Sequence, residues 1–112
     1  MTNDLSPLVS DAFRLFQEEA PAHAQAWMAA VHQLGEASSL DEKSRALVYL
    51  AVLAALRMES GLPFHVAQAR RLGASRADVI SAILTGLPAA GMAVLAALPA
   101  VVRALDAAEQ GT

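Results

Sequence analysis

The chain has 112 residues, of which 55% are hydrophobic and only 17% charged, and its net charge at pH 7 is -3. This length suits a single domain, and the apolar fraction is more than so small a chain easily buries alone, which favours a subunit interface. The eight basic residues form no continuous stripe, so binding to nucleic acid is not expected. The sequence contains no cysteine, which excludes disulfides and thiol chemistry.

Two segments bear on membranes and targeting. Residues 1–10 lack the basic region of a signal peptide, so we expect a cytoplasmic protein. Residues 79–102 carry no charge and are long enough to cross a bilayer, but Gly86, Pro88 and Gly91 interrupt them. We expect two shorter buried helices there, and no membrane span.

The N-terminal third predicts two helices. Residues 5–19 form the first, and Pro21 suits the first turn of a second that ends before Gly35. Apolar residues spaced three and four apart predict one buried stripe on this second helix. They are Trp27, Met28, Val31 and Leu34.

A third helix is predicted over residues 40–56. Ser39 followed by Glu42 has the spacing of a capping box at its start. Apolar residues occur nearly all round it, which is typical of a central, buried helix. They are Leu47, Val48, Leu50, Val52, Leu53 and Leu56.

The remaining helices follow from proline, glycine and capping signals. Pro63 opens a fourth helix that ends at Gly73, and Ser75 with Asp78 forms a capping box for a fifth. After the connector 86–91, a sixth helix contains Pro99 as a kink or a break. The sequence therefore predicts an all-α bundle of about six helices. We expect one domain over 1–112, with an N-terminal hairpin at 1–37 and a four-helix core at 38–112.

Several motifs occur together in a recognisable order. They are Leu40-Asp41-Glu42-Lys43-Ser44-Arg45, then an apolar helix, then Phe64-His65-Val66, then Leu72-Gly73-Ala74-Ser75-Arg76. Over residues 40–105 the chain resembles the carboxymuconolactone decarboxylase and alkylhydroperoxidase D-like family. The resemblance implies an all-helical fold that assembles as a homo-oligomer, a trimer or a hexamer.

In the thiol peroxidase branch of that family, two cysteines, a histidine and an upstream glutamate carry the reaction. The resemblance places the first cysteine at Met58, the second at Gly61, the histidine at His65 and the glutamate at Ala46. Because three of these four groups are replaced, we expect no thiol peroxidase activity.

Helical geometry agrees with the positions that the resemblance implies. If the fourth helix reaches back to Met58, residues 58, 61 and 65 lie within about 60° of one another on one face. His65 could be a general acid or base in an apolar pocket, or a structural histidine bonded to a backbone carbonyl. Tyr49 could donate a proton beside His65, or be a buried ring with a satisfied hydroxyl. We expect His65 to be catalytic, and Tyr49, Met58 and Gly61 to line a ligand pocket.

His23 and His32 lie nine residues apart, on opposite faces of one predicted helix, and we expect neither a metal site nor a cofactor. The favoured function is non-redox chemistry on a small organic molecule, such as lactone decarboxylation or isomerisation, with His65 moving the proton. A second possibility is a non-catalytic oligomer that binds a small apolar ligand or a protein partner. The family's default, a peroxidase reduced by an external thiol, is the third.

Overall fold

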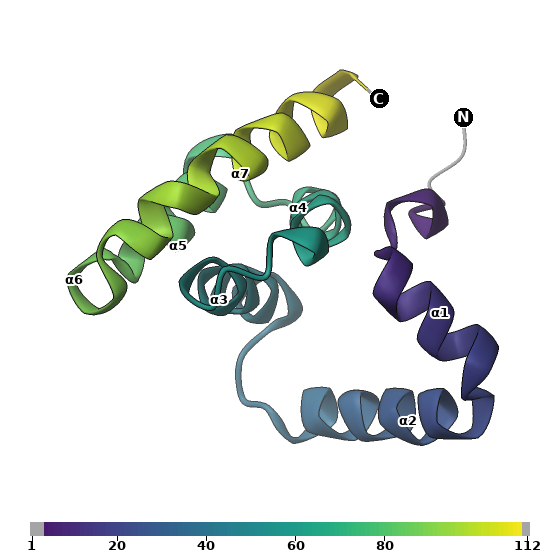
Figure 1. Ribbon diagram of the computed structural model, residues 1–112. Helices are drawn as coiled ribbons and strands as arrows, with labels where there is room; N and C mark the ends of the chain where they lie inside the picture. The colour runs from purple at the N-terminus through teal and green to yellow at the C-terminus, as the bar shows by residue number, and fades with distance from the viewer. Residues whose placement is uncertain (1–3, 111–112) are drawn as a thin grey trace.

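The computed structural model describes residues 4–110, and this part of the chain is all-α, without strands (Figure 1). The predicted fold class is therefore confirmed. The elements are the 3₁₀ helix η1 (Ser6–Leu8), α1 (Asp11–Glu19), α2 (Pro21–Ala37), α3 (Glu42–Ala55), the 3₁₀ helix η2 (Glu59–Gly61), α4 (Leu62–Arg71), α5 (Arg76–Thr85), the short α6 (Leu87–Ala90) and α7 (Met92–Gln110).

Residues 4–37, which we call the arm, form a hairpin in which α1 packs against α2 (Figure 1). The predicted single helix over 5–19 is interrupted, because Val9 has an extended backbone with φ -65° and ψ 136°. Ser10 then caps α1, where its hydroxyl accepts a hydrogen bond of 3.2 Å from the Phe13 N–H. Helix α2 continues through Gly35, beyond its predicted end.

Helices α3–α7, which we call the bundle, enclose the main cluster of buried side chains. α7 packs along α4 and α5, and α3 packs against α4, α5 and α7. The largest fully buried side chains are Leu50, Leu62, Val66, Val79, Ile83, Val94, Val101 and Leu105. Each such aliphatic side chain contributes about 1.5–3 kcal/mol through burial, so this cluster holds the fold together.

Burial all round α3 was predicted, and this is wrong. Leu50 and Leu53 are buried, but Val48, Val52 and Leu56 are 53%, 46% and 64% exposed. The bundle helices cover only part of α3, so about half of the surface of these apolar residues stays exposed.

The predicted buried stripe of α2 is also wrong. Its members Trp27, Met28, Val31 and Leu34 are 56%, 45%, 42% and 70% exposed. Only Ala24 on this helix is buried. α2 packs mainly against α1, which leaves the rest of its apolar side uncovered.

Capping explains where two bundle helices begin. The capping box of Ser75 and Asp78 is present at α5 and confirms the prediction. At α3, however, the cap is Asp41 and not Ser39, since an Asp41 carboxylate oxygen accepts a hydrogen bond of 2.7 Å from the Ser44 N–H. A carboxylate one residue before the helix satisfies the same free N–H groups that the serine was expected to satisfy.

The uncharged segment 79–102 is divided among α5, α6 and α7. Gly91, with φ 60°, makes the turn from α6 into α7, a conformation that glycine adopts without strain. α7 continues through Pro99, so no break occurs there. Within residues 4–110, no helix is long and apolar enough to cross a membrane.

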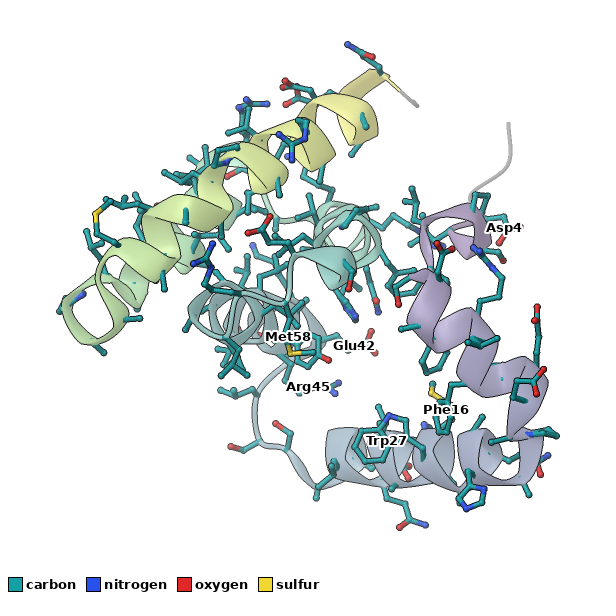
Figure 2. The ribbon with its side chains drawn as sticks, viewed as in Figure 1. Asp4, Phe16, Trp27, Glu42, Arg45 and Met58 are labelled. Carbon is teal, nitrogen blue, oxygen red and sulfur yellow. The ribbon has the colours of Figure 1, made fainter. Side chains whose placement is uncertain are left out.

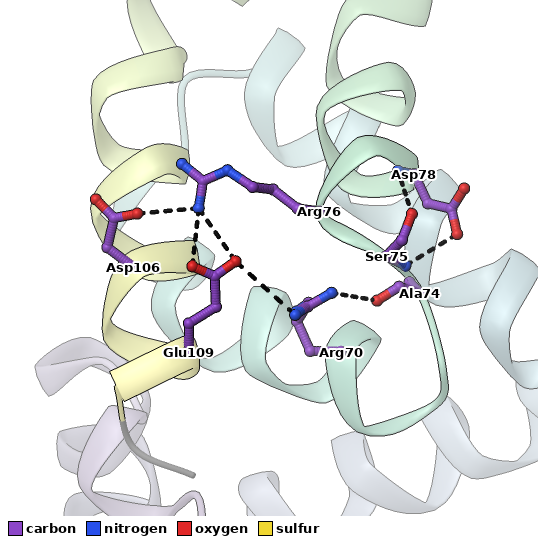
Figure 3. A network of polar contacts seen from close by, with 7 residues as sticks. All are labelled: Arg70, Ala74, Ser75, Arg76, Asp78, Asp106 and Glu109. Carbon is purple, nitrogen blue, oxygen red and sulfur yellow. Dashed lines mark hydrogen bonds and ion pairs between the residues drawn. The ribbon is translucent and has the colours of Figure 1, made fainter.

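An ion-pair network joins the end of α7 to α4 and α5 (Figure 3). The Arg76 guanidinium donates to Asp106 at 2.9 Å and to Glu109 at 3.2 Å. Arg70 lies 3.9 Å from Glu109 and also donates to the Ala74 carbonyl at 2.9 Å. Because these groups are partly exposed, solvent screens the pairs and each adds little to the stability of the fold.

Two helices of the bundle end in the same way. Arg57 follows α3 with φ 59°, and Gly73 follows α4 with φ 99°. In both places the next N–H donates to a carbonyl five residues earlier, at 2.9 Å for Met58 and 3.0 Å for Ala74. This is the closing bond of a Schellman motif, in which glycine is the usual residue.

We therefore expect Arg57→Gly to raise the free energy of unfolding by about 0.5–1 kcal/mol, because the left-handed conformation strains any residue with a Cβ. Gly73→Ala should lower it by about 1 kcal/mol. A Cβ at Gly73 would have no atom within 4 Å, so this variant measures strain and not a clash. Urea unfolding followed by far-UV circular dichroism checks both, and an unchanged midpoint for Arg57→Gly would contradict the prediction.

Candidate functional site

His65 lies in the first turn of α4, against a residue of α3. Its ring centroid is 4.6 Å from that of Tyr49, at an interplanar angle of 56°, and the Phe64 ring meets it edge-on at 5.0 Å. Among residues 4–110, the His65 imidazole makes no hydrogen bond to another residue. The alternative of a structural histidine bonded to a backbone carbonyl is therefore wrong for this part of the chain. The imidazole nitrogens are available to a bound molecule.

Partial burial lowers the pKa of His65 below its ordinary value of 6.5. The physical cause is desolvation, which disfavours the charged imidazolium. The ring is therefore mostly neutral at pH 7. A neutral imidazole can accept a proton from a substrate and return it later.

Gly61 brings an unoccupied Cβ position to the side of His65. A Cβ built at Gly61 would lie 3.8 Å from Cδ2 of His65 and 3.4 Å from Cδ1 of Leu53. These are ordinary van der Waals contacts, and the backbone φ of -87° suits any residue. A side chain at position 61 would therefore pack beside the imidazole, as the motif spacing implies.

Met58 does not share a helix with His65. The 3₁₀ helix η2 lies between them, and α4 begins only at Leu62, so the expected single helical face over 58, 61 and 65 is wrong. The Met58 side chain is 52% exposed and points from the bundle toward the arm (Figure 2). Of positions 58, 61 and 65, only Gly61 and His65 lie side by side as expected.

Tyr49 is 48% exposed, so the expectation of a buried ring with a satisfied hydroxyl is wrong. One ring face packs on His65 while the rest of the side chain reaches the surface. Ala46, which lies about one turn earlier on α3, packs against the buried cluster and contributes no polar group. The expected proximity of Tyr49 and His65 is nevertheless present.

Two contacts of the described residues were not predicted from the sequence. A Cβ at Gly35 would come within 2.5 Å of Nη1 of Arg45, so the Arg45 guanidinium lies directly against the end of α2. The Nε atom of Arg45 is buried, and it has no hydrogen-bond partner among residues 4–110. His32 lies 3.5 Å from Glu36, a pair that their four-residue spacing could have revealed. In the described part of the chain, no group of three His, Asp or Glu could hold a metal ion.

Two surface hollows of the described residues lie away from His65. The larger, about 700 Å³ in volume, is lined by η1, by both ends of α4 and by the end of α7, and the smaller lies next to it. Neither is lined by Tyr49, Met58, Gly61 or His65. The predicted ligand pocket therefore coincides with neither hollow, and it stays a prediction.

These features describe an all-helical protein whose candidate site is a partly buried histidine at the start of a bundle helix. The model of the carboxymuconolactone decarboxylase family matches residues 21–110, which covers most of the chain. The chain belongs to this family, as the sequence motifs indicate. No curated protein and no solved structure matches it.

The lowered pKa of His65 makes folding stability depend on pH. Below about pH 6.5 the unfolded chain protonates this histidine before the folded chain does, so the free energy of unfolding falls as the pH drops through this region. His65→Gln removes the effect. Melting temperatures between pH 8 and 5 should therefore fall more for the wild type than for His65→Gln.

The matched control is His23→Gln, an exposed histidine of α2, which should follow the wild type. The lowered pKa values of Asp41 and Asp78, caused by hydrogen bonds at the helix starts, affect stability only at more acidic pH. Parallel melting curves for the wild type and His65→Gln over the whole pH range would contradict the prediction.

Proposed function

We propose that the protein is a cysteine-less enzyme of its family that moves a proton on a small, largely apolar organic molecule. Lactone decarboxylation, isomerisation and related proton transfers are the reactions that fit. The observation that supports this most is the partly buried His65, whose lowered pKa favours the neutral form, in contact with the Tyr49 ring. The observation concerns a single imidazole, so the proposal depends on His65.

Five residues have roles in this proposal. In an isomerisation, His65 accepts a proton from one substrate atom and donates it to another. In a decarboxylation, His65 takes the carboxyl proton, CO2 leaves, and His65 donates that proton to the carbon that keeps the electron pair. The Tyr49 hydroxyl, or the Arg57 guanidinium, stabilises the negative charge that develops on the carbonyl oxygen of the substrate. Gly61 leaves space beside the imidazole for a small substrate group, and Met58 provides apolar surface at the margin.

Loss of activity in His65→Gln tests the proposal. On a panel of lactone carboxylates that includes a carboxymuconolactone, kcat/KM should fall by roughly 100-fold or more, because general acid–base catalysis contributes about that much. His23→Gln should retain full activity. For the wild type, kcat/KM should also fall below the pKa of His65, that is, at a pH under 6.5.

Tyr49→Phe separates the two roles within the site. It keeps the ring against His65 and removes only the hydroxyl, so we expect a fall of about 10-fold in kcat, the effect of one hydrogen bond in the transition state. The acid limb of the pH profile should stay in place. Equal activity of the wild type and His65→Gln would remove His65 from the mechanism.

A thiol peroxidase is not proposed, because the chain has no cysteine and Ala46 cannot relay a proton. With an alkyl hydroperoxide and a dihydrolipoyl carrier, the wild type should consume no peroxide above background. Gly61→Cys is the positive control for oxidation, since its Cβ has room, and peroxide should convert its thiol to the sulfenic acid, detected as one added oxygen by mass spectrometry. Clear turnover by the wild type would overturn the proposal.

A non-catalytic role is the second candidate, and the exposed apolar residues around the site favour it. Tyr49, Val52 and Met58 are all about half exposed, as in surfaces that bind an apolar ligand or a partner. In that case His65→Gln would change binding or assembly and no turnover would be found. Assembly as a homo-oligomer, a trimer or a hexamer, is part of our proposal in either case, and a cytoplasmic location without a cofactor stays a prediction.

A further inference from the structure

Arg45, near the start of α3, differs from the arginines that hold the fold together. Arg14, Arg70 and Arg76 each donate a hydrogen bond to a carboxylate or a backbone carbonyl. Within residues 4–110 the Arg45 guanidinium donates to no other residue, and its buried Nε atom has no partner. Buried polar groups in proteins are nearly always hydrogen-bonded, so an unpaired one points to a molecule that the chain alone does not supply.

The acidic residues next to Arg45 in the sequence do not pair with it. The Asp41 carboxylate caps α3, where it accepts a hydrogen bond of 2.7 Å from the Ser44 N–H. Arg45 is the weakest of the influences that lower the pKa of Asp41. Glu42 forms no ion pair with any residue of the described part of the chain. Arg45 therefore carries a positive charge without a paired counter-charge.

The position of the Arg45 guanidinium depends on a glycine of α2. A Cβ at Gly35 would come within 2.5 Å of Nη1 and 3.5 Å of Cζ of Arg45, so glycine leaves the room that this group occupies. Among the side-chain nitrogens of Arg45 only Nε is fully buried without a partner, so the terminal nitrogens Nη1 and Nη2 are open to solvent. The guanidinium is thus held on one side and accessible on the other.

Arg45 also lies on the side of α3 that carries the candidate site. Tyr49 follows it by four residues, which places the two side chains next to each other, about 6 Å apart along the helix axis. Side chains on a helix lean toward its N-terminus, so Tyr49 leans toward Arg45. The Tyr49 ring in turn packs on His65, with centroids 4.6 Å apart. In Figure 2, Arg45 and Met58 both extend from the bundle toward α2.

We propose that Arg45 binds the carboxylate of a small organic ligand whose apolar body lies over Tyr49 and His65. A guanidinium can donate two parallel hydrogen bonds to a carboxylate, which suits a group that is accessible on one side. The ligand class is an organic anion whose carboxylate stands about one helical turn from the carbon that reacts. This inference rests on the proposed function, and it narrows the substrate to a carboxylate and names the residue that binds it.

A comparison of a carboxylate with its methyl ester tests this role without requiring turnover. The probes are a butyrolactone carboxylate and its methyl ester, and their binding is measured by isothermal titration calorimetry at low ionic strength. The wild type should bind the carboxylate more tightly than the ester. Arg45→Gln should weaken binding of the carboxylate at least about 10-fold, the effect of losing hydrogen bonds to a charged group, and leave binding of the ester unchanged.

Gly35→Ala moves the guanidinium and keeps its charge. The new Cβ takes the place of Nη1, which is at the flexible end of its side chain, so the guanidinium shifts and the fold stays intact. This variant should lose part of the preference for the carboxylate, although alanine favours a helix more than glycine does. If net charge alone attracted the probe, Gly35→Ala would behave like the wild type.

Arg103→Gln is the matched control. Arg103 is an exposed arginine of α7, so this variant changes the net charge as Arg45→Gln does, and it should bind both probes like the wild type. Far-UV circular dichroism and the melting temperature of each variant separate loss of binding from loss of folding. His65→Gln should keep the preference for the carboxylate, so failure of the enzyme proposal leaves this test intact.

Three outcomes would overturn the proposal. The first is a wild type that binds neither probe, or that binds both equally. The second is an unchanged preference in Arg45→Gln, and its loss in Arg57→Gln would then assign the carboxylate to that arginine. The third is unchanged probe binding in Arg45→Gln together with altered sedimentation, which means that Arg45 pairs with a carboxylate of another protein chain. None of these outcomes removes His65 from the mechanism, because its role is tested by turnover.

Discussion

The packing of one side of α3 against the other bundle helices determines the geometry of everything described above. Leu50 and Leu53 are buried on that side, and Leu53 also lies beside Gly61. This contact fixes the chain where α4 begins, and His65 follows one turn later. Tyr49 points away from the buried side and meets the imidazole there. A cavity at Leu53 would therefore disturb both the bundle and the candidate site.

The opposite side of α3 is an apolar surface that the bundle does not cover. A helix that is apolar nearly all round must bury both sides, and the bundle covers only one. The apolar side of α2 in the arm is also uncovered, because α1 covers only the beginning of this helix. Two helices with unsatisfied surfaces in one small chain explain why its composition is so apolar.

The helices were largely predictable from the sequence because their signals are local. Pro21, Pro63 and the Ser75–Asp78 capping box act through bonds and sterics within a few residues, and all occur where predicted. Burial was not predictable in this way. Periodicity shows which side of α2 or α3 is apolar, but the neighbour that covers it comes from distant parts of the chain or from another molecule.

In the candidate site, too, local features were predictable and contacts between distant parts of the chain were not. The spacing of Gly61 and His65 is local, and the two are adjacent as expected. Met58 was misplaced because Arg57 ends α3 in a left-handed conformation and η2 intervenes, so the assumed continuous helix does not exist. The room around Gly61 means that the backbone there does not depend on the side chain that it carries. Different side chains at this single position would reshape the wall beside the imidazole on an unchanged scaffold, so reactivity and framework can be redesigned separately.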